Sequence, residues 1–495
     1  MSKEFTNRIV EEFSSYEAKL NGLTDSDFHK IKKEAISVFS ELGLPTHKHE
    51  DWKYTSVNFL RKNDFNVVIE NDNIEISSDL IEKHVLKEME ENLLVFVNGY
   101  FRRDLSDIKE TNEKVIIGGL SEAMKNHPDM IKNHFACHAD CRKDVFTALN
   151  TAFAQDGVFL YLPNNFEMSL PVHFLYINTS DDRSPMTNPR NLVIVGENSR
   201  VKLFETIVTE GENQSFTNMV TEVNLARYSK VDYGKIQNDS DSSYFIGTTK
   251  VTQEESSDFH NSTITLGGKF VRNNLHVLMN GEHCESNFHG FYFMDGDRFV
   301  DNHTIADHAS SNCNSDEVFK GILDDNSTAV FNGRVLVRQH AQKTNAYQSN
   351  KNILLSDKAT INSKPELEIY ADDVKCSHGA TSGSLDEDSL FYLKTRGINE
   401  KLAKSLLLNA FANDVIEKVQ LPELRRDIQR RIADRLGIGH HEGQFRHQIG
   451  GDDRFMDDHA VRDVDQQVEG SIQGQAGFRK YQPPIGGIVQ CSFEP

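Results

Sequence analysis

Cys376 and His378 have the residue types best suited to metal chemistry in this sequence. On an extended strand, side chains two positions apart point to the same face, so both would reach one ligand. Thiolate sulfur and imidazole nitrogen are borderline-soft ligands that suit iron or zinc. Two ligands do not complete a site, so a metal here would need further ligands from elsewhere in the chain or from a second chain. The structural alternative is a core cysteine beside a capping histidine.

A second group of possible ligands has helical spacing. It consists of His134, Cys137, His138 and Cys141. On one helix these four side chains would share a face. A single straight helix cannot surround an ion tetrahedrally, although two helices could contribute to a shared site. The alternative is a helix face with two buried cysteines and two surface histidines.

A third group is dispersed over the strand-rich part of the chain, where stacked strands could bring some members together. Its members are His283, Cys284, His289, His303, His308, Cys313 and His340. Linear spacing does not determine which of them meet. Each residue taken singly is interpreted as a satisfied or exposed side chain.

Standard catalytic signatures are missing from the sequence. It contains no Walker loop, no GxGxxG after a strand, no GxSxG elbow, no HExxH and no CxxC. An enzyme of this size can lack all of these motifs, so their absence argues only in part against catalysis.

Composition restricts the class of protein. The 495 residues include 54 Lys and Arg against 75 Asp and Glu, a net charge of −21, which argues against a nucleic-acid partner. With 38% hydrophobic and 26% charged residues the chain reads as globular. No apolar run approaches the ~18–20 residues that span a bilayer, and no secretory signal is visible at the start. With few, scattered cysteines, we expect a cytoplasmic protein without a membrane partner.

The chain divides by pattern into helical ends and a strand-rich middle. Apolar residues recur at helical spacing over residues 4–42, and Asp25 is expected to cap the second of two helices there. A strand is expected over residues 93–97. From about Gly157 to Tyr370, strand-like runs follow one another at roughly 8–12-residue spacing.

The strand-rich middle could form a sandwich, a barrel or a solenoid. Prolines are absent between Pro189 and Pro365, and the turns are short and rich in Asn, Asp, Ser and Gly. These two features favour a β-helix, which stacks short strands with tight polar corners. A strict repeat period is not visible, so the pattern alone leaves the alternatives open.

After Gly383 helical patterns return, with Asn399 as an expected cap and a further helix following Pro422. Beyond Gly437 apolar periodicity vanishes, as in a flexible or unrelated tail. The expected domains are a mostly helical region with a short strand pair (1–155), a β-helix core (156–385), a C-terminal helical region (386–437) and the tail (438–495).

Five stretches of the sequence together resemble a known family. Residues 371–381 and 390–398 closely resemble the SufB/SufD family of iron–sulfur cluster assembly proteins. The other stretches that agree are residues 50–55, 95–99 and 149–161. The resemblance extends over about residues 1–437. B-type subunits read more like EHEAT and FYC where this sequence has Cys-Ser-His-Gly-Ala-Thr and Phe-Tyr-Leu, so the resemblance is closest to D-type subunits.

The resemblance implies a mainly β fold, a right-handed parallel β-helix between helical terminal regions. It also implies a non-catalytic scaffold in a complex with a SufB-type subunit and a SufC-type ABC ATPase, with sulfur supplied by a cysteine desulfurase system. In the family, the histidine matching His378 is implicated at the interface between B and D, where a transient, shared iron–sulfur cluster is thought to form. Cys376 beside it offers a second soft ligand.

The family's ATPase binds the C-terminal helices of B and D, so we expect docking on Leu406, Phe411 and Val415, part of an apolar stripe. The alternative is that this stripe caps the solenoid.

The rival interpretation is a β-helical polysaccharide-active enzyme. Its acid and base would be paired carboxylates such as Asp372-Asp373 or Asp324-Asp325. Sequence neighbours on a strand point to opposite faces, which weakens that pairing. A third possibility, a β-helical adhesin, would predict a secretion signal.

Overall fold

The computed structural model describes residues 2–19, 26–70, 74–86, 89–110 and 112–437. The predicted tail at 438–495 and the expected cap Asp25 lie outside the described residues. Within the described part of the chain, no helix combines the length and apolar character needed to cross a bilayer.

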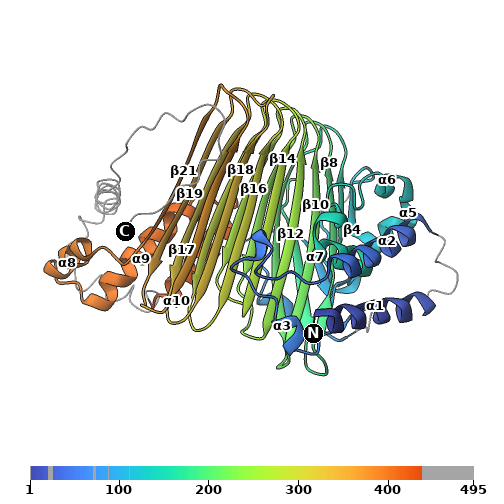
Figure 1. Cartoon of the computed structure of the whole chain (residues 1–495), viewed down its shortest axis with the longest axis horizontal. Helices are drawn as coiled ribbons and strands as arrows, with labels where there is room; N and C mark the ends of the chain where they lie inside the picture. Colours follow the sequence, from blue (N-terminus) through green and yellow to red (C-terminus); the bar gives the residue numbers. More distant parts are fainter. Residues whose placement is uncertain (1, 20–25, 71–73, 87–88, 111, 438–495) are drawn as a thin grey trace.

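The described residues form a parallel β-solenoid of about eight turns (Figure 1). Each turn contributes one strand to each of two sheets, which we call sheet A and sheet B. Sheet A contains β1 (Asn66–Val67), β4 (Ile116–Gly119), β5 (Val158–Leu162), β7 (Pro185–Thr187), β8 (Arg190–Val195), β10 (Ser215–Leu225), β12 (Ser243–Gln253), β14 (Phe270–Met279), β16 (Phe299–His308), β18 (Thr328–Val337) and β20 (Thr360–Ile369). Sheet B contains β2 (Asn92–Val97), β3 (Tyr100–Phe101), β6 (Val172–Thr179), β9 (Arg200–Glu210), β11 (Lys230–Gln237), β13 (Asp258–Thr265), β15 (Glu285–Met294), β17 (Asn314–Leu323), β19 (Asn345–Leu354) and β21 (Lys375–Gly383).

The helices lie at the ends and flanks of the solenoid (Figure 1). The N-terminal region contains α1 (Ser2–Lys19), α2 (Asp27–Leu42), α3 (Phe59–Lys62), α4 (Ser78–Glu82), α5 (Leu120–Asn126), α6 (Pro128–Lys132) and α7 (Val145–Phe153). Three short 3-10 turns, η2 (Glu50–Trp52), η3 (Arg103–Leu105) and η4 (Cys141–Lys143), lie between them. The C-terminal region contains α8 (Glu387–Thr395), α9 (Glu400–Ile416) and α10 (Pro422–Arg435).

The predicted fold class is confirmed: a parallel β-helix lies between helical terminal regions. The structure tests the expected caps of two helices, one in each terminal region. The Ser26 side chain caps α2 by accepting a hydrogen bond from the His29 backbone N–H, one residue after the expected cap. At α9 the expected cap is confirmed, since the Asn399 side chain accepts a hydrogen bond from the Leu402 backbone N–H.

One corner of the solenoid repeats at the same register position on six successive turns, just before strands β9, β11, β13, β15, β17 and β19 of sheet B. A residue with left-handed φ stands there, followed by a small buried side chain. The left-handed residues are Asn198, Tyr228, Ser256, His283, Asn312 and Lys343. The small residues that follow are Ser199, Ser229, Ser257, Cys284, Cys313 and Thr344. The hydroxyls and thiols of these residues donate to backbone carbonyls of the corner, as Ser257 does to Glu254 and Cys284 to Gly281.

The corner explains why no strict period is visible in the sequence. Left-handed φ is adopted here by Tyr, His and Lys as well as by Asn, so no single residue type marks the position. The corners are also unequally spaced along the chain. Repetition is therefore present in the backbone and in side-chain size, and only weakly in residue identity.

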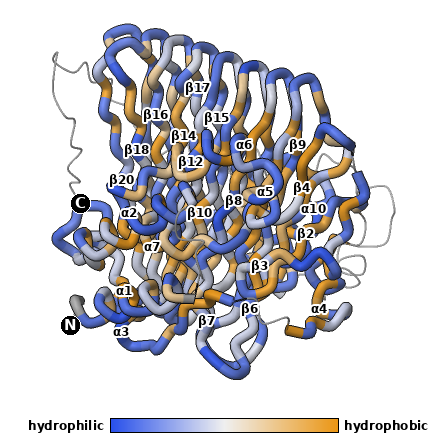
Figure 2. The backbone as a smooth tube through the Cα atoms, turned by 90° about the vertical axis from the view of Figure 1, so that its right-hand side faces the viewer, coloured by the Kyte–Doolittle hydropathy of each residue, from blue (hydrophilic) through white to orange (hydrophobic). Residues whose placement is uncertain are grey.

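The outer face of each sheet is covered by a different terminal region. On sheet A, Phe146 of α7 lies in one apolar cluster with Trp52 and Phe216 of β10. On sheet B, Phe411 of α9 and Ile428 of α10 lie in one cluster with Phe291 of β15 and Ile322 of β17. Figure 2 shows the same solenoid from the side, with hydrophilic residues along its upper corners and a mixture of hydrophobic and hydrophilic residues along the strands.

Candidate functional site

The last turn of the solenoid, formed by β20 and β21, is open. Both are terminal strands of their sheets, and no other strand of the described residues pairs with their outer edges. The lumen-facing residues 346, 348, 350 and 352 of β19 are buried, whereas those of β21 at the equivalent positions are half-buried or exposed. The open end therefore presents both unpaired backbone groups and the last layer of lumen side chains.

Cys376 and His378 lie in this last layer on β21. In register they follow Ala346 and Gln348 of β19, which face the lumen. The expected geometry is confirmed to this extent: the two side chains point to the same face of one strand, inward. Whether they act as ligands stays a prediction.

The His378 imidazole is half-buried and lacks a partner at one ring nitrogen. Its Nδ1 atom is buried and makes no hydrogen bond. Burial lowers the pKa of His378, so the ring is neutral at neutral pH. A neutral imidazole has a nitrogen lone pair available for a metal.

Cys376 packs against the apolar core of the lumen. Burial raises the pKa of its thiol to about 11, so the sulfur is protonated at neutral pH. The thiolate is the form that ligates a metal, so a metal must displace this proton. Of the two candidate ligands, His378 is the one that is ready to bind without losing a proton.

The pair remains incomplete as a metal site. Within the described ranges, no group of three or more His, Cys, Asp or Glu side chains is placed to hold a metal ion. Iron bound at the open end would therefore need ligands that another chain or the cargo itself supplies.

The group His134, Cys137, His138 and Cys141 is not on one helix, contrary to the helical prediction. Residues 133–139 form turns after α6, and Cys141 begins the turn η4. The turn is held by Glu222, whose carboxylate accepts hydrogen bonds from the backbone N–H groups of residues 136, 138 and 139 and is paired with Arg190. Both Arg190 and Glu222 are fully buried, so the spacing of the four side chains reflects a fixed turn.

The dispersed third group does not converge on one site among the described residues. Cys284 and Cys313 meet because they stack at the corner on neighbouring turns. The histidines have separate partners: His289 with Asp316, His303 with Asp301, and His308 with Ser315. These residues are structural members of different turns.

The stretch around Trp52 has a structural role that the sequence did not reveal. The Arg272 guanidinium lies 3.7 Å from the Trp52 ring centroid and forms a buried ion pair with Asp301 at 2.7 Å. Thr55 donates a hydrogen bond to the same Asp301 carboxylate. Residues 50–55 therefore fasten the N-terminal region to the outer face of sheet A.

The three residues expected to dock an ATPase occupy different environments. Phe411 and Val415 of α9 are buried against sheet B, whereas Leu406 on the same helix is half-buried. The alternative expected the stripe to cap the end of the solenoid. The stripe instead lies against the outer face of sheet B, on the flank of the solenoid. The exposed apolar side chains of this region are on α8, where Phe391 is 69% and Tyr392 45% exposed.

The carboxylates of the rival interpretation support turns. The side chain of Asp324 accepts a hydrogen bond from the Asp325 backbone N–H, and the Asp325 side chain accepts one from the Gly296 backbone N–H. The polysaccharide-active alternative is therefore not supported by this pair.

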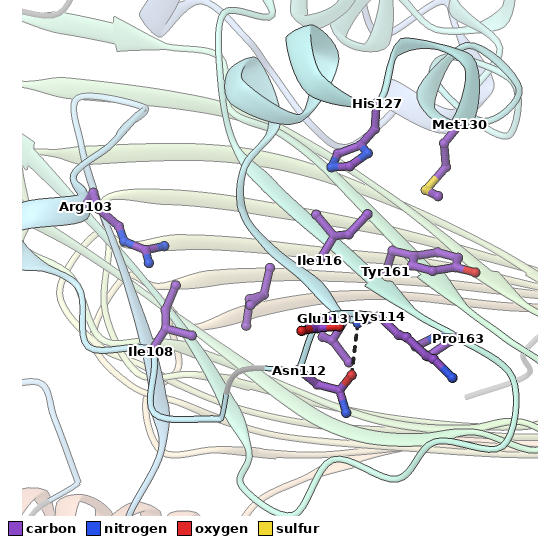
Figure 3. Close-up of a pocket in the computed structure, with 12 residues that line it drawn as sticks. Arg103, Ile108, Asn112, Glu113, Lys114, Ile116, His127, Met130, Tyr161 and Pro163 are labelled. Atoms are coloured by element: carbon purple, nitrogen blue, oxygen red, sulfur yellow. Dashed lines mark hydrogen bonds between the residues drawn. The ribbon is translucent and has the colours of Figure 1, made fainter.

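A hollow of about 710 Å³ lies beside β4, at the opposite end of sheet A from β20 (Figure 3). Aliphatic side chains such as Ile116 and Met130 line it together with Arg103, Glu113 and His127. It includes neither Cys376 nor His378, so it is separate from the candidate site.

Comparisons with known proteins agree with this architecture. The family described as "SufBD protein N-terminal region" matches residues 4–174, and "SUF system FeS cluster assembly, SufBD core domain" matches residues 176–411. A SufBD family protein of Synechocystis is 33% identical over 431 residues, which cover 85% of this chain and 93% of that protein.

Two further relatives are similar over most of their length. The iron–sulfur cluster assembly protein SufD of Escherichia coli is 29% identical over 80% of this chain and 90% of its own. A chloroplastic protein of Arabidopsis thaliana, ABCI7, is 30% identical over 82% of this chain and 86% of its own. With both family regions matched along a solenoid that has helical ends, this chain belongs to the SufBD family of iron–sulfur cluster assembly proteins and is close to SufD.

Proposed function

We propose that this protein is a non-catalytic scaffold subunit on which iron–sulfur clusters are built. In this proposal it pairs with a SufB-type subunit through the open end of its solenoid. A SufC-type ABC ATPase docks on its C-terminal helices and hydrolyses ATP, and a cysteine desulfurase system supplies sulfur. The cluster is a transient cargo shared with the partner subunit.

The observation that carries the proposal is the incomplete ligand pair at an unpaired end. The strands β20 and β21 leave backbone donors and acceptors free along their outer edges among the described residues. A strand edge of this kind is suited to pairing with another chain. Such pairing would place the partner's side chains next to His378 and Cys376, where further ligands are needed.

A crosslinking experiment tests the pairing. A photoreactive amino acid at Ser382, an exposed position on β21, is expected to crosslink to a co-expressed SufB-type subunit. The same group at Lys114, exposed at the other end of the solenoid, is the matched control and is expected to give no crosslink. A crosslink from Lys114 and none from Ser382 would place the partner elsewhere.

The role of His378 is tested in the complex with both partners, purified without oxygen. His378→Ala is expected to keep complex formation and thermal melting unchanged, while bound iron and sulfide fall to background. His340→Ala is the matched control, because His340 is an exposed histidine in the corner that precedes β19. Normal iron and sulfide in His378→Ala would contradict the proposed role.

The proposed docking of the ATPase must use exposed residues of the C-terminal helices. Phe411 and Val415 are engaged with sheet B and hold α9 in place. Leu406, which is half-buried, and the exposed Phe391 and Tyr392 of α8 are the apolar side chains offered to a partner. An aromatic side chain exposed to this degree is costly to leave in water and is common at interfaces.

A further inference from the structure

A column of polar side chains leads through the lumen to His378. On successive strands of sheet B, the same register position is occupied by Phe288, Glu317, Gln348 and His378. The first member is apolar and the next three are polar. Glu317 is 1% and Gln348 4% exposed, so this is a buried polar column that ends at the candidate ligand.

Glu317 determines which way the Gln348 amide points. The Gln348 Nε2 group donates a 2.8 Å hydrogen bond to Glu317 Oε2, and Thr304 of β16 donates to Glu317 Oε1. Because Nε2 is the donor in this hydrogen bond, the amide presents its NH₂ group to Glu317. Its carbonyl oxygen, Gln348 Oε1, is therefore free to point away from Glu317.

Gln348 and His378, the next two neighbours in the column, each have one buried polar atom without a hydrogen-bond partner. Gln348 Oε1 is buried and accepts no hydrogen bond, and His378 Nδ1 is buried and makes none. The two residues are register neighbours on adjacent parallel strands, which lie about 4.8 Å apart. Buried polar atoms normally find partners, and here an unpartnered acceptor on β19 and an unpartnered ring nitrogen on β21 belong to register neighbours.

The opposite wall of the lumen is shaped to admit the glutamine. A Cβ atom at Gly333 of β18 would lie 2.3 Å from Gln348 Nε2 and 2.8 Å from the Phe331 ring. A larger residue at this position would displace the Gln348 amide from its observed place. The glutamine is thus accommodated by a neighbouring residue as well as oriented by Glu317.

We propose that Gln348, oriented by Glu317, is a positioning residue for His378: its Oε1 accepts a hydrogen bond from Nδ1–H and so leaves the Nε2 lone pair for iron. A histidine that binds a metal through one ring nitrogen generally donates a hydrogen bond from the N–H of the other to a neighbouring acceptor. This hydrogen bond selects the tautomer and the ring orientation. This inference deepens the proposed function and rests on the role of His378 there.

The tautomer of His378 can be measured without any cluster. In the full chain with ¹⁵N-labelled histidine, the His378 signals are assigned by their loss in His378→Ala. We expect a protonated Nδ1 and an unprotonated Nε2 in the wild-type protein, and loss of this preference in Gln348→Leu. A wild-type ring protonated at Nε2, or the same tautomer in Gln348→Leu, would overturn the inference.

Exchanging the two residues keeps the test valid if Gln348→Leu fails to fold. In Glu317→Gln/Gln348→Glu, the new amide at 317 donates to the new carboxylate at 348, and that carboxylate still accepts from His378 Nδ1–H. We expect this double variant to retain the wild-type tautomer. Loss of the tautomer in a double variant that melts like the wild type would also overturn the inference.

Cluster assembly in the complex then separates this inference from the proposed function. We expect Gln348→Leu to lower the rate of assembly by about 10–100-fold, the usual effect of losing a ligand's hydrogen-bond partner, and the double variant to restore it. If the tautomer depends on Gln348 while His378→Ala assembles clusters normally, the proposed function fails and the positioning stands. If His378→Ala assembles none while the tautomer ignores Gln348, the positioning fails and the proposed function stands.

Discussion

At the scale of single residues, burial acts in opposite directions on the two candidate ligands. Burial lowers the pKa of His378 and so favours the unprotonated imidazole, and it raises the pKa of Cys376 and so favours the protonated thiol. In both cases the uncharged form is favoured away from water. The neutral imidazole is competent to bind iron, and the neutral thiol is not. This difference supports His378 as the principal ligand of the pair.

The raised pKa of Cys376 predicts slow alkylation. With its pKa near 11 in place of 9, the thiol at pH 8 has roughly a hundredfold less thiolate than an ordinary cysteine. We therefore expect the rate of iodoacetamide labelling at Cys376, followed by peptide mass spectrometry, to keep rising up to about pH 11. A plateau near pH 9 would show that the thiol titrates normally.

Glu317 predicts a pH dependence of stability. Burial raises its pKa from 4.5 to about 7, so between these values the folded state binds a proton that the unfolded state has lost. Stability from this group is therefore fully present below about pH 4.5 and is lost as pH rises through about 7, by about 3 kcal/mol in total. We expect urea unfolding to show this loss in the wild-type protein relative to Glu317→Gln. A difference between the two proteins that does not vary with pH would contradict the shift.

At the scale of elements, α9 shows that a helix can hold two roles on two faces. Its buried face packs on β15 and β17, where the Lys320 ammonium also donates to the Phe411 carbonyl and pairs with Asp414. Another part of α9 packs on α8 through Leu393, Ala403 and Leu407. The helix is thus fixed from two sides, and α8 carries the exposed aromatic residues outward.

The same arrangement predicts how charge substitutions separate docking from folding. Phe391→Glu changes a side chain that is 69% exposed, so we expect normal melting together with at least tenfold weaker binding of the ATPase subunit in a titration. Val415→Glu is the contrasting variant, because it buries a charge against sheet B and should lower the melting temperature markedly. Unchanged ATPase binding by Phe391→Glu would remove α8 from the docking surface.

The turn held by Glu222 gives a second prediction at this scale. Glu222→Gln leaves the fully buried Arg190 without its counter-ion and is expected to destabilise the protein by about 3–5 kcal/mol in denaturant unfolding. Arg190→Met/Glu222→Leu removes both charges and should recover part of that loss. A fully stable Glu222→Gln protein would show that the pair contributes little.

At the scale of the whole molecule, the two ends of the solenoid differ. At the first end the terminal strands β3 and β4 are short and antiparallel to their neighbours, and N-terminal helices lie nearby, whereas the last turn ends in two longer parallel strands whose lumen side chains are half-buried or exposed (Figure 1). A stack of turns in which each pairs with its neighbours can continue into another chain at an open end. This asymmetry is the feature of the whole molecule that most favours a partner subunit.

The segment 438–495 is expected to be dispensable for this architecture. Its sequence has little apolar content to offset an ordering entropy of roughly 1–2 kcal/mol per residue. Deleting it should leave thermal melting and complex formation unchanged, as measured by calorimetry and co-purification with both partners. A large loss of either would show that the segment packs on the rest of the chain.

Sequence patterns alone determined the local elements and the family. The helical periodicity, the cap Asn399 and the polar turns depend on interactions between near neighbours, which residue order specifies directly. The same-face placement of Cys376 and His378 follows from strand geometry. The long motifs at 371–381 and 390–398 pointed to the family that the comparisons then showed.

Only the tertiary structure decided which distant residues meet. The column of Glu317, Gln348 and His378 depends on the register of three strands, and unequal corner lengths hide that register in the sequence. The burial of Phe411 and Val415 depends on which face of α9 meets sheet B, which an apolar stripe alone does not specify. The sequence predicts a helix over 134–141, whereas the structure has a turn at 133–139. Its backbone N–H groups donate hydrogen bonds to Glu222, which is distant in sequence and which local periodicity does not reveal. Contacts of this kind are set by packing between turns, and packing is a property of the folded chain as a whole.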